Sequence, residues 1–216
     1  MRKEQYNFSL YLVTDRNLSR PRSIEEVVKL AIEGGVTAVQ LREKDSSTRE
    51  FIEIAKRIKE ITASSNIPLI INDRVDIALA VDADGVHLGQ TDMPYHIARK
   101  IMGKNKIIGL SVENMEQATE AEELDVDYLG VSPIFTTPTK SELQTQWGLE
   151  GLSKLRQKTK HILVGIGGIN ASNAQSVIEA GADGIAVVSA ICSASDPRKS
   201  ASELREIVDK TKRKML

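Results

Sequence analysis

A short pattern that recurs four times limits the fold of this chain more than any other feature. Each copy reads small apolar residue, Asp or Thr, any residue, aliphatic residue, any residue, aliphatic residue. The copies lie at 35–41, 82–88, 125–131 and 181–187, and each follows a run with helical spacing of apolar residues. Aliphatic residues at every second position are typical of strands, so the pattern predicts four loop-and-strand units.

Four further apolar runs, at 8–13, 69–71, 107–110 and 162–164, alternate with these copies and bring the predicted strands to eight. Helices are expected between them, and three capping boxes, which begin at Ser23, Ser47 and Ser200, predict where some helices start. Eight strands that alternate with helices in 216 residues predict an α/β fold, a (β/α)8 TIM barrel that spans residues 1–216 as a single domain.

Composition excludes several classes of protein. Charged residues make up 27%, hydrophobic residues 41%, and the net charge is -1, so no broad field is expected to attract nucleic acid. We find no signal-peptide core and no apolar run long enough to cross a membrane, and the single Cys192 excludes an intrachain disulfide. We therefore expect a cytoplasmic protein that binds neither membranes nor nucleic acid; a homo-oligomer is left open.

Two acidic residues follow separate strands and are expected to meet at one rim of the barrel. Apolar runs at 68–71 and 85–88 are joined by helical spacing over 74–81, which predicts a strand-helix-strand unit. Parallel strands joined in this way share a carboxyl end, so Asp73 and Asp92 should emerge on the same side. Magnesium takes one or two protein carboxylates plus substrate phosphates. The alternative is that both aspartates cap the helices that follow them.

Cations are predicted at the same rim. Alternation along the second strand puts Gln40, Arg42 and Lys44 on one side, at the barrel mouth. Holding Arg42 and Lys44 away from water would cost on the order of several kcal/mol for each cation. An anionic ligand would offset that cost. The alternative is that Arg42 and Lys44 pair with Glu43, Asp45 or other nearby acids.

A second anion site is predicted where the last two strands end. The segment 165–169 reads Gly-Ile-Gly-Gly-Ile, and Val188-Ser189 follows the last strand. Barrels often build phosphate sites from these two loops, where glycines let backbone N–H groups approach the oxygens. The hydroxyls and the lysine of 136–140 would suit a phosphate or an ordinary solvated loop equally. They lie within 132–147, the longest stretch without clear periodicity and the candidate for a mobile loop.

Histidine and cysteine are not expected to do the chemistry. His96 falls in a predicted helix, His161 at a strand entrance, and His87 faces the same side as Gly85, as a core or supporting residue would. Cys192 has no partnered base. The residues thus predict a barrel enzyme with one metal-assisted and one metal-free anion site, and hence two phosphorylated substrates. The scarcity of a general base favours a reaction that is driven by loss of diphosphate.

The chain resembles the thiamine phosphate synthase family from Tyr11 to Ser189. The motifs that carry the resemblance are Gln40-x-Arg42-x-Lys44, Asn72-Asp73, His87-Leu88-Gly89-Gln90-x-Asp92, Gly109-x-Ser111, Gly130-Val131-Ser132-Pro133-Ile134-Phe135, Thr137-x-Thr139-Lys140, Gly165-Ile166-Gly167-Gly168-Ile169 and Val188-Ser189. The family joins a hydroxymethylpyrimidine diphosphate to a hydroxyethylthiazole phosphate, which gives thiamine phosphate and diphosphate.

The resemblance implies a set of roles, assigned by position. Asp73 and Asp92 would hold Mg²⁺, the implied cofactor. The pyrimidine diphosphate would contact Gln40, Arg42, Lys44, Asn72, Ser111 and Lys140, and of these Arg42, Lys44, Ser111 and Lys140 would act in the reaction itself. The thiazole phosphate would contact Thr137, Pro138, Thr139, Gly168, Val188 and Ser189. The implied reaction is dissociative: diphosphate leaves first and the thiazole nitrogen captures the resulting cation.

The departures from the family pattern are small. Many relatives have Pro where this chain has Thr136, and 141–147 match no fixed pattern. Three rival functions were weighed. A thiazole tautomerase-like barrel would not be expected to keep the Gln-Arg-Lys trio together with both aspartates. A non-catalytic phosphate-ligand sensor would not need a metal pair that faces cations. A sugar-phosphate epimerase would show paired acid and base residues at the mouth.

Overall fold

The computed structural model describes residues 6–136 and 146–215, and these residues form a closed barrel of eight parallel strands in the order β1 to β8. The strands are β1 (Leu10–Val13), β2 (Ala38–Leu41), β3 (Leu69–Asn72), β4 (Gly85–Leu88), β5 (Ile107–Val112), β6 (Tyr128–Val131), β7 (Leu163–Ile166) and β8 (Gly184–Val187). β1 pairs with β8 through Leu10 and Ile185, which closes the barrel. The predicted (β/α)8 fold is confirmed.

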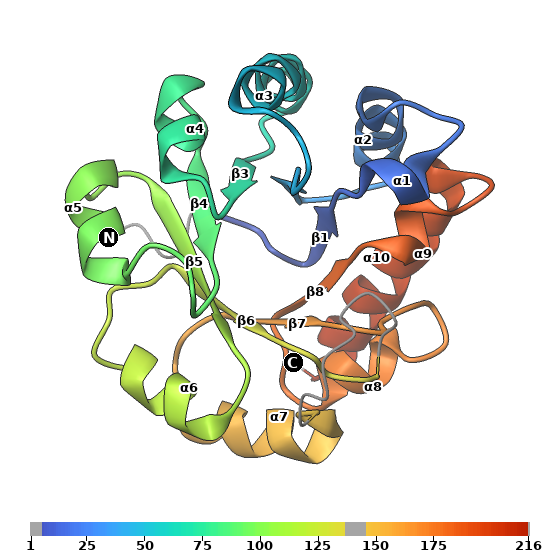
Figure 1. Cartoon of the computed structure of the whole chain (residues 1–216). Helices are drawn as coiled ribbons and strands as arrows, with labels where there is room; N and C mark the ends of the chain where they lie inside the picture. The colour runs from blue at the N-terminus through green and yellow to red at the C-terminus, as the bar shows by residue number, and fades with distance from the viewer. Residues whose placement is uncertain (1–5, 137–145, 216) are drawn as a thin grey trace.

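Helices surround the strands on the outside (Figure 1). They are α1 (Arg16–Ser19), α2 (Ile24–Glu33), α3 (Thr48–Ser64), α4 (Val75–Ala80), α5 (Tyr95–Met102), α6 (Met115–Ala121), α7 (Gly148–Arg156), α8 (Ala174–Glu179), α9 (Ser189–Cys192) and α10 (Pro197–Met215). In the described part of the chain, no helix is both long enough and apolar enough to cross a membrane.

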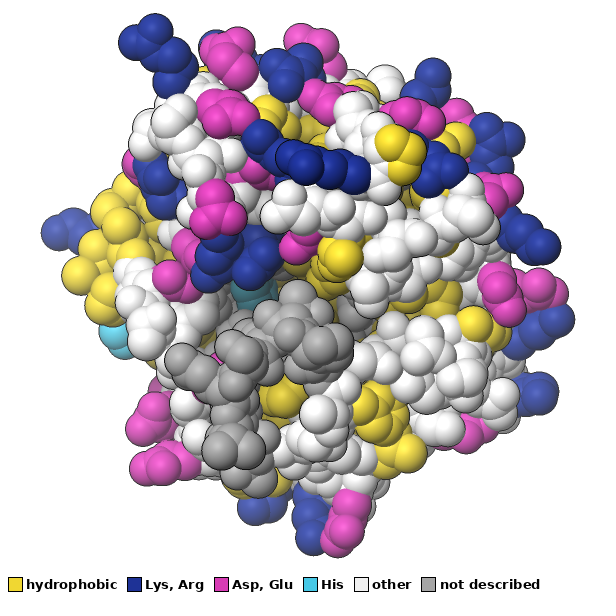
Figure 2. Space-filling view, turned by 45° about the vertical axis from the view of Figure 1, so that its right-hand side comes forward, with side chains coloured by type: hydrophobic (Ala, Val, Ile, Leu, Met, Phe, Trp, Pro, Cys, Tyr) yellow, Lys and Arg dark blue, Asp and Glu magenta, His cyan; other side chains and the backbone are white. Residues whose placement is uncertain are grey.

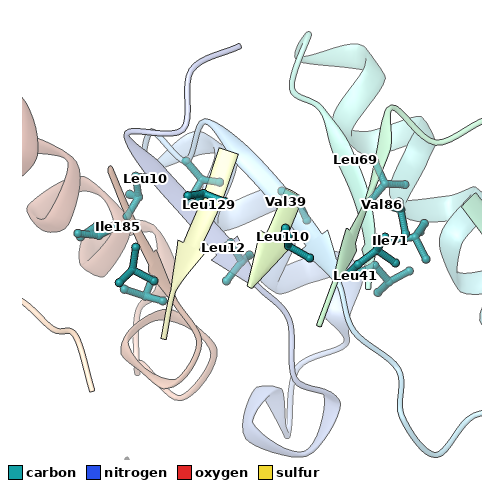
Figure 3. Packing of buried hydrophobic residues seen from close by; sticks show 14 of the residues in the cluster. Leu10, Leu12, Val39, Leu41, Leu69, Ile71, Val86, Leu110, Leu129 and Ile185 are labelled. Atoms are coloured by element: carbon teal, nitrogen blue, oxygen red, sulfur yellow. The ribbon is translucent and has the colours of Figure 1, made fainter. Parts of the chain in front are cut away.

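Alternation along the strands separates two apolar regions. Outward positions such as Leu12, Val39 and Leu110 join the large cluster that packs against the helices (Figure 3). Inward positions form a smaller cluster within the barrel, which contains Tyr11 and Tyr128. The expectation that Val39 and Leu41 face the helices is confirmed, since both belong to the outer cluster and are inaccessible to solvent.

The fourfold repeat has a structural cause at the amino end of the barrel. Its Asp or Thr lies just before an even-numbered strand and accepts a hydrogen bond from the first or second N–H group of the preceding odd-numbered strand. These bonds run from Leu10 to Thr37 Oγ1 (3.0 Å) and from Leu69, Ile108 and Leu163 to Oδ2 of Asp84, Asp127 and Asp183 (2.8 Å each). The same three carboxylates pair with Lys59, Arg99 and Arg156. Each copy therefore fixes the register of one strand pair.

Helix starts were predicted correctly in two of three places. Ser23 and Ser47 cap α2 and α3, because their side chains accept hydrogen bonds from the N–H groups of Glu26 and Glu50. The box at Ser200 was wrong. α10 begins at Pro197, and the Asp196 carboxylate accepts from the N–H group of Lys199 at 3.0 Å. Ser200 instead donates its hydroxyl to the carbonyl oxygen of Ala190.

We predict that Asp127→Ala lowers the free energy of unfolding by about 1–3 kcal/mol, because the Ile108 N–H group and the Arg99 guanidinium lose their shared acceptor. Urea unfolding measures the change. Asp76→Ala is the matched control: its carboxylate is 62% exposed and pairs with Arg74 at the surface, so we expect a loss of about 0.5 kcal/mol or less. Equal losses in the two variants would contradict this explanation of the repeat.

Candidate active site

The predicted site residues follow the carboxyl ends of several strands and therefore share one rim of the barrel. Gln40 lies in β2, Asn72 ends β3, Asp92 follows β4, Ser111 lies near the end of β5, and Gly168 follows β7. Basic and acidic side chains lie interspersed on the face that Figure 2 shows, rather than as a field of one sign. Charge at this rim consequently acts locally.

Asp73 and Asp92 come together, as predicted. The pKa of the Asp73 carboxyl is raised above its ordinary value because the side chain is partly desolvated and because the Asp92 carboxyl lies in hydrogen-bonding contact with it; Lys44 acts in the opposite direction. Asp73 also adopts a positive φ of 61°, which costs conformational energy for a residue other than glycine. Asp73 therefore combines backbone strain with electrostatic repulsion from the Asp92 carboxylate.

The alternative role of these aspartates as helix caps is wrong. The residues that precede α4 and α5 in cap position are Arg74 and Pro94, and neither helix has a side-chain cap. Asp92 instead accepts a hydrogen bond from the N–H group of Gly89 at 2.7 Å, which holds its carboxylate over the end of β4. Asp73 donates its backbone N–H to the carbonyl oxygen of His87 at 2.9 Å. Both aspartates are thus anchored to β4 or to the residue that follows it.

The two cations have acidic partners, and this corrects one premise of the sequence analysis. Arg42 Nη1 lies 3.7 Å from Asp15 Oδ2, and Lys44 Nζ lies 3.4 Å from Asp73 Oδ2. The Lys44 side chain is also 54% exposed, so it bears little desolvation cost. Both pairs are long and open to solvent, and such pairs contribute little to stability. They leave the cations available to an anionic ligand.

Glu43 explains why the motif alternates so strictly. Its side chain is only 4% exposed and accepts hydrogen bonds from Arg16 Nη2 (2.6 Å) and Ser46 Oγ (2.7 Å). The Arg42 N–H group bonds to Thr14 Oγ1 at 3.1 Å. Glu43 therefore points into the protein while Arg42 and Lys44 point to the mouth. Sequence reasoning missed Thr14, Asp15 and Arg16, which come from the loop after β1 and the first residue of α1.

Gln40 and Ser111 are connected by three residues that sequence reasoning did not place in the site. Gln40 Nε2 donates to the Tyr11 hydroxyl at 3.1 Å, and the Tyr11 and Tyr128 hydroxyl oxygens are 2.9 Å apart. His87 lies 2.9 Å from Tyr128 through Nδ1 and 2.8 Å from Ser111 Oγ through Nε2. His87 is a supporting residue, as predicted. Strand alternation was the available signal for both tyrosines, because they occupy inward positions.

The loops after β7 and β8 lie next to each other. Gly168 and Val188 come two residues after Ile166 and Ala186, which are register partners. Gly168 has a φ of 66°, and a Cβ atom there would lie 2.9 Å from the carbonyl oxygen of Thr136. Glycine is therefore needed, and the loop after β6 is brought against the turn.

Four predicted contact residues, Thr137, Pro138, Thr139 and Lys140, lie outside the described residues, as does most of the expected mobile loop. The ends of that segment are described. Phe135 donates its N–H to the carbonyl oxygen of Gly167 at 3.1 Å, and Trp147 donates its own to that of Pro133 at 3.0 Å. Phe135 therefore lies beside the turn that contains Gly168, and Trp147 lies beside Pro133.

The acidic pair fits magnesium better than a metal that is held by protein alone. Among residues 6–136 and 146–215, no cluster of three or more His, Cys, Asp or Glu side chains could hold a metal ion. A magnesium site needs only one or two carboxylates when substrate phosphates supply the other ligands. A cation between Asp73 and Asp92 would also relieve the repulsion that raises the pKa of Asp73.

Comparisons with known proteins identify the family of the chain. The family model described as thiamine monophosphate synthase matches residues 10–191. The chain is 54% identical over 201 residues to a thiamine-phosphate synthase from Syntrophomonas wolfei, with 93% of this chain and 96% of the relative covered. It is 55% identical over 196 residues to one from Vibrio campbellii, with 91% and 95% covered.

Solved structures give the same result. A thiamine phosphate pyrophosphorylase from Pyrococcus furiosus superposes with a TM-score of 0.87 at 46% identity, and the match covers 94% of this chain and 96% of the other. A 3-hexulose-6-phosphate synthase, at 19% identity and a TM-score of 0.68 over 92% and 99% of the two chains, shows the shared fold alone. The chain belongs to the thiamine monophosphate synthase family and is a transferase.

Proposed function

We propose that this enzyme joins 4-amino-2-methyl-5-(diphosphooxymethyl)pyrimidine to 4-methyl-5-(2-phosphooxyethyl)thiazole, which yields thiamine phosphate and diphosphate. The single observation that carries the proposal is the Asp73 and Asp92 pair, which repel each other beside the side chains of Arg42 and Lys44. The two aspartates would bind a metal ion, and the two basic side chains would bind an anion. Together they suit the Mg²⁺ complex of a diphosphate. High identity to named synthases supports the same substrates.

The chain's own residues would bind and orient the leaving group. Arg42 and Lys44 would exchange their long contacts with Asp15 and Asp73 for shorter, charge-assisted bonds to diphosphate oxygens. Asn72 and Lys140 would add contacts, and Asp73 and Asp92 would hold Mg²⁺. When bound, Mg²⁺ would supply Lewis acidity to the departing diphosphate. No nucleophilic side chain is needed, because stabilising the departing anion lowers the barrier.

The thiazole phosphate would occupy the other side of the rim. The turn at Gly168, the start of α9 at Ser189, and residues Thr137 to Thr139 would surround its phosphate group. The hydrogen bond from Asn173 Nδ2 to the carbonyl oxygen of Gly168, at 3.0 Å, supports this assignment because it gives that oxygen a donor and holds the turn in place. Val188, half-buried, would contact the organic part of the ligand. A cytoplasmic location is part of the same proposal.

The rival functions have less support. A tautomerase-like barrel or a phosphate sensor would have no use for repelling carboxylates that face Arg42 and Lys44. The one imidazole near the rim, that of His87, is bonded to Tyr128 and Ser111 through its two ring nitrogens, so it is poorly suited to act as the base of an epimerase.

We predict that Asp73→Asn and Asp92→Asn each lower the rate of coupling about 100-fold or more, since each replaces a carboxylate that would hold Mg²⁺ by a neutral amide. Both heterocycles are supplied with Mg²⁺, with and without a chelator, and thiamine phosphate is measured as its fluorescent oxidation product. Wild-type enzyme should form product only without the chelator. Asp45→Asn, a change at an exposed aspartate beside Lys44, is the matched control and should be near wild type.

Measuring the folding stability of Asp73→Asn distinguishes loss of the metal site from misfolding. A carboxyl whose folded pKa is raised above its unfolded value favours the folded state at low pH, and that contribution is lost as pH rises through the folded pKa. Above that pH the ionised Asp73 destabilises the metal-free fold, so Asp73→Asn should be at least as stable as wild type in chelator. Unchanged turnover in both variants at saturating Mg²⁺ would contradict the proposed metal site.

We predict that Ser189→Asp weakens binding of the thiazole phosphate about tenfold or more by charge repulsion, and leaves binding of the pyrimidine diphosphate nearly unaltered. Isothermal titration calorimetry with each ligand alone measures both affinities. Ser193→Asp, which makes the same change four residues along at the exposed end of α9, is the control. Equal losses for the two ligands would argue against two separate anion sites.

A further inference from the structure

A continuous chain of hydrogen bonds crosses the inside of the barrel, from β2 to β5. It runs from Gln40 through Tyr11, Tyr128 and His87 to Ser111, with successive distances of 3.1, 2.9, 2.9 and 2.8 Å. Only its two end residues are predicted to contact a substrate. The three middle residues have no part in the function proposed above.

The interior is shaped to hold this chain. The hydroxyl-bearing rings of Tyr11 and Tyr128 are each only 1% exposed, and the His87 ring stacks on Tyr128 with centroids 5.5 Å apart and planes inclined by 19°. Two glycines make room. A Cβ atom at Gly109 would overlap the Tyr128 ring, and one at Gly130 would lie 3.0 Å from His87 Cε1. Burial raises the pKa of both tyrosines well above the ordinary value, so both keep their hydroxyl hydrogens.

The direction of every bond follows from one end. The Gln40 Nε2 atom can only donate, so the Tyr11 hydroxyl accepts from it. The Tyr128 oxygen, 2.9 Å away, is then the acceptor for the buried Tyr11 hydrogen, an arrangement that leaves every donor of the chain with a partner. Tyr128 in turn gives its hydrogen to His87 Nδ1. The hydrogen of the imidazole then lies on Nε2 and is donated to Ser111 Oγ. Ser111 accepts within the chain and keeps its own hydrogen for another acceptor.

We propose that this chain is a polarity device: Tyr11, Tyr128 and His87 are positioning residues that make Gln40 present its Oε1 acceptor, and Ser111 its hydroxyl donor, to the bound pyrimidine. The inference rests on the function proposed above and adds to it the basis of substrate choice. A ligand that fits must donate to Gln40 and accept from Ser111. An aminopyrimidine has both kinds of group, an exocyclic N–H donor and ring-nitrogen acceptors.

Cooperativity explains why the chain has several members. Each bond polarises the next, and reversing any one bond requires all the others to reverse. The Gln40 amide, which alone could turn by half a rotation and exchange its donor and acceptor, is thereby held in one orientation. Breaking the chain at Tyr128, which is linked to Gln40 through the Tyr11 hydroxyl, should release this restraint.

The first test concerns the ligand-free protein and does not depend on its function. Nitrogen-15 NMR of the imidazole rings distinguishes the two neutral tautomers, and His87 has only His96 and His161 as companions. We expect hydrogen on Nε2 of His87 in the wild type, and a mixture of tautomers in Tyr128→Phe. Hydrogen on Nδ1 in the wild type, or an unchanged His87 spectrum in Tyr128→Phe, would overturn the proposal.

The second test measures recognition. Calorimetry compares dissociation constants for the aminopyrimidine diphosphate and for its 4-oxo analogue, in which a carbonyl oxygen replaces the amino group. We expect wild type to prefer the amino compound, and Tyr128→Phe to lose about tenfold of that preference. Tyr95→Phe is the matched control, because its hydroxyl accepts from Arg99 on α5 outside the barrel, and its preference should be unchanged.

The outcomes separate this inference from the function on which it rests. An unchanged preference in Tyr128→Phe, or an equal loss in Tyr95→Phe, would overturn the polarity device while the proposed reaction stands. Failure of the wild type to bind either diphosphate would overturn the proposed function and the recognition it includes, whereas the tautomer of His87 would still test the chain itself.

Discussion

Closure of eight parallel strands into a barrel is the constraint on which the rest of the structure depends. Because side chains alternate along each strand, every second residue must lie inside the barrel, and every carboxyl end must reach one rim. The Asp and Thr residues of the repeat fix the register at the opposite end, through bonds such as that from Ile108 to Asp127. The position of each rim residue therefore follows from a hydrogen bond made at the other end of the barrel.

The ion pairs of Arg42 and Lys44 at the rim are weak enough for a bound ligand to replace them. Arg42 and Lys44 keep long contacts with Asp15 and Asp73, whereas the buried Glu43 is held by Arg16 at 2.6 Å. The tight pair supports the loop and the loose pairs are available to ligands. Repulsion between Asp73 and Asp92 is maintained by two backbone anchors: the Asp73 N–H group donates to the His87 carbonyl oxygen in β4, and the Asp92 carboxylate accepts from the Gly89 N–H group. A bound cation would remove that repulsion, and cation affinity is thus built into the fold.

Local sequence patterns predicted the features that depend on nearby residues, such as the positions of the strands. Aliphatic alternation located the strands, and β4 has the predicted bounds, because burial on the outer face selects residues such as Val86 and Leu88. The convergence of Asp73 and Asp92 followed from the strand-helix-strand geometry. The box at Ser200 failed because the same four-residue spacing occurs inside a helix, and Asp196 followed by Pro197 is the stronger start signal.

Contacts between distant segments could not be predicted in the same way. The pairing of Arg42 with Asp15 depends on how the loops after β1 and β2 meet, and nothing in the sequence near Arg42 specifies it. The chain from Gln40 to Ser111 needs the closed barrel, since its five members come from five different strands. Both arrangements result from tertiary structure, which a reading of local spacing does not include.

A crystal structure with the pyrimidine diphosphate and Mg²⁺ tests the central claim most directly. We expect electron density for a metal ion in contact with the carboxylates of Asp73 and Asp92, and for the diphosphate between that ion and the side chains of Arg42 and Lys44. Density for the diphosphate at another part of the molecule, with both aspartates free of metal, would contradict the account.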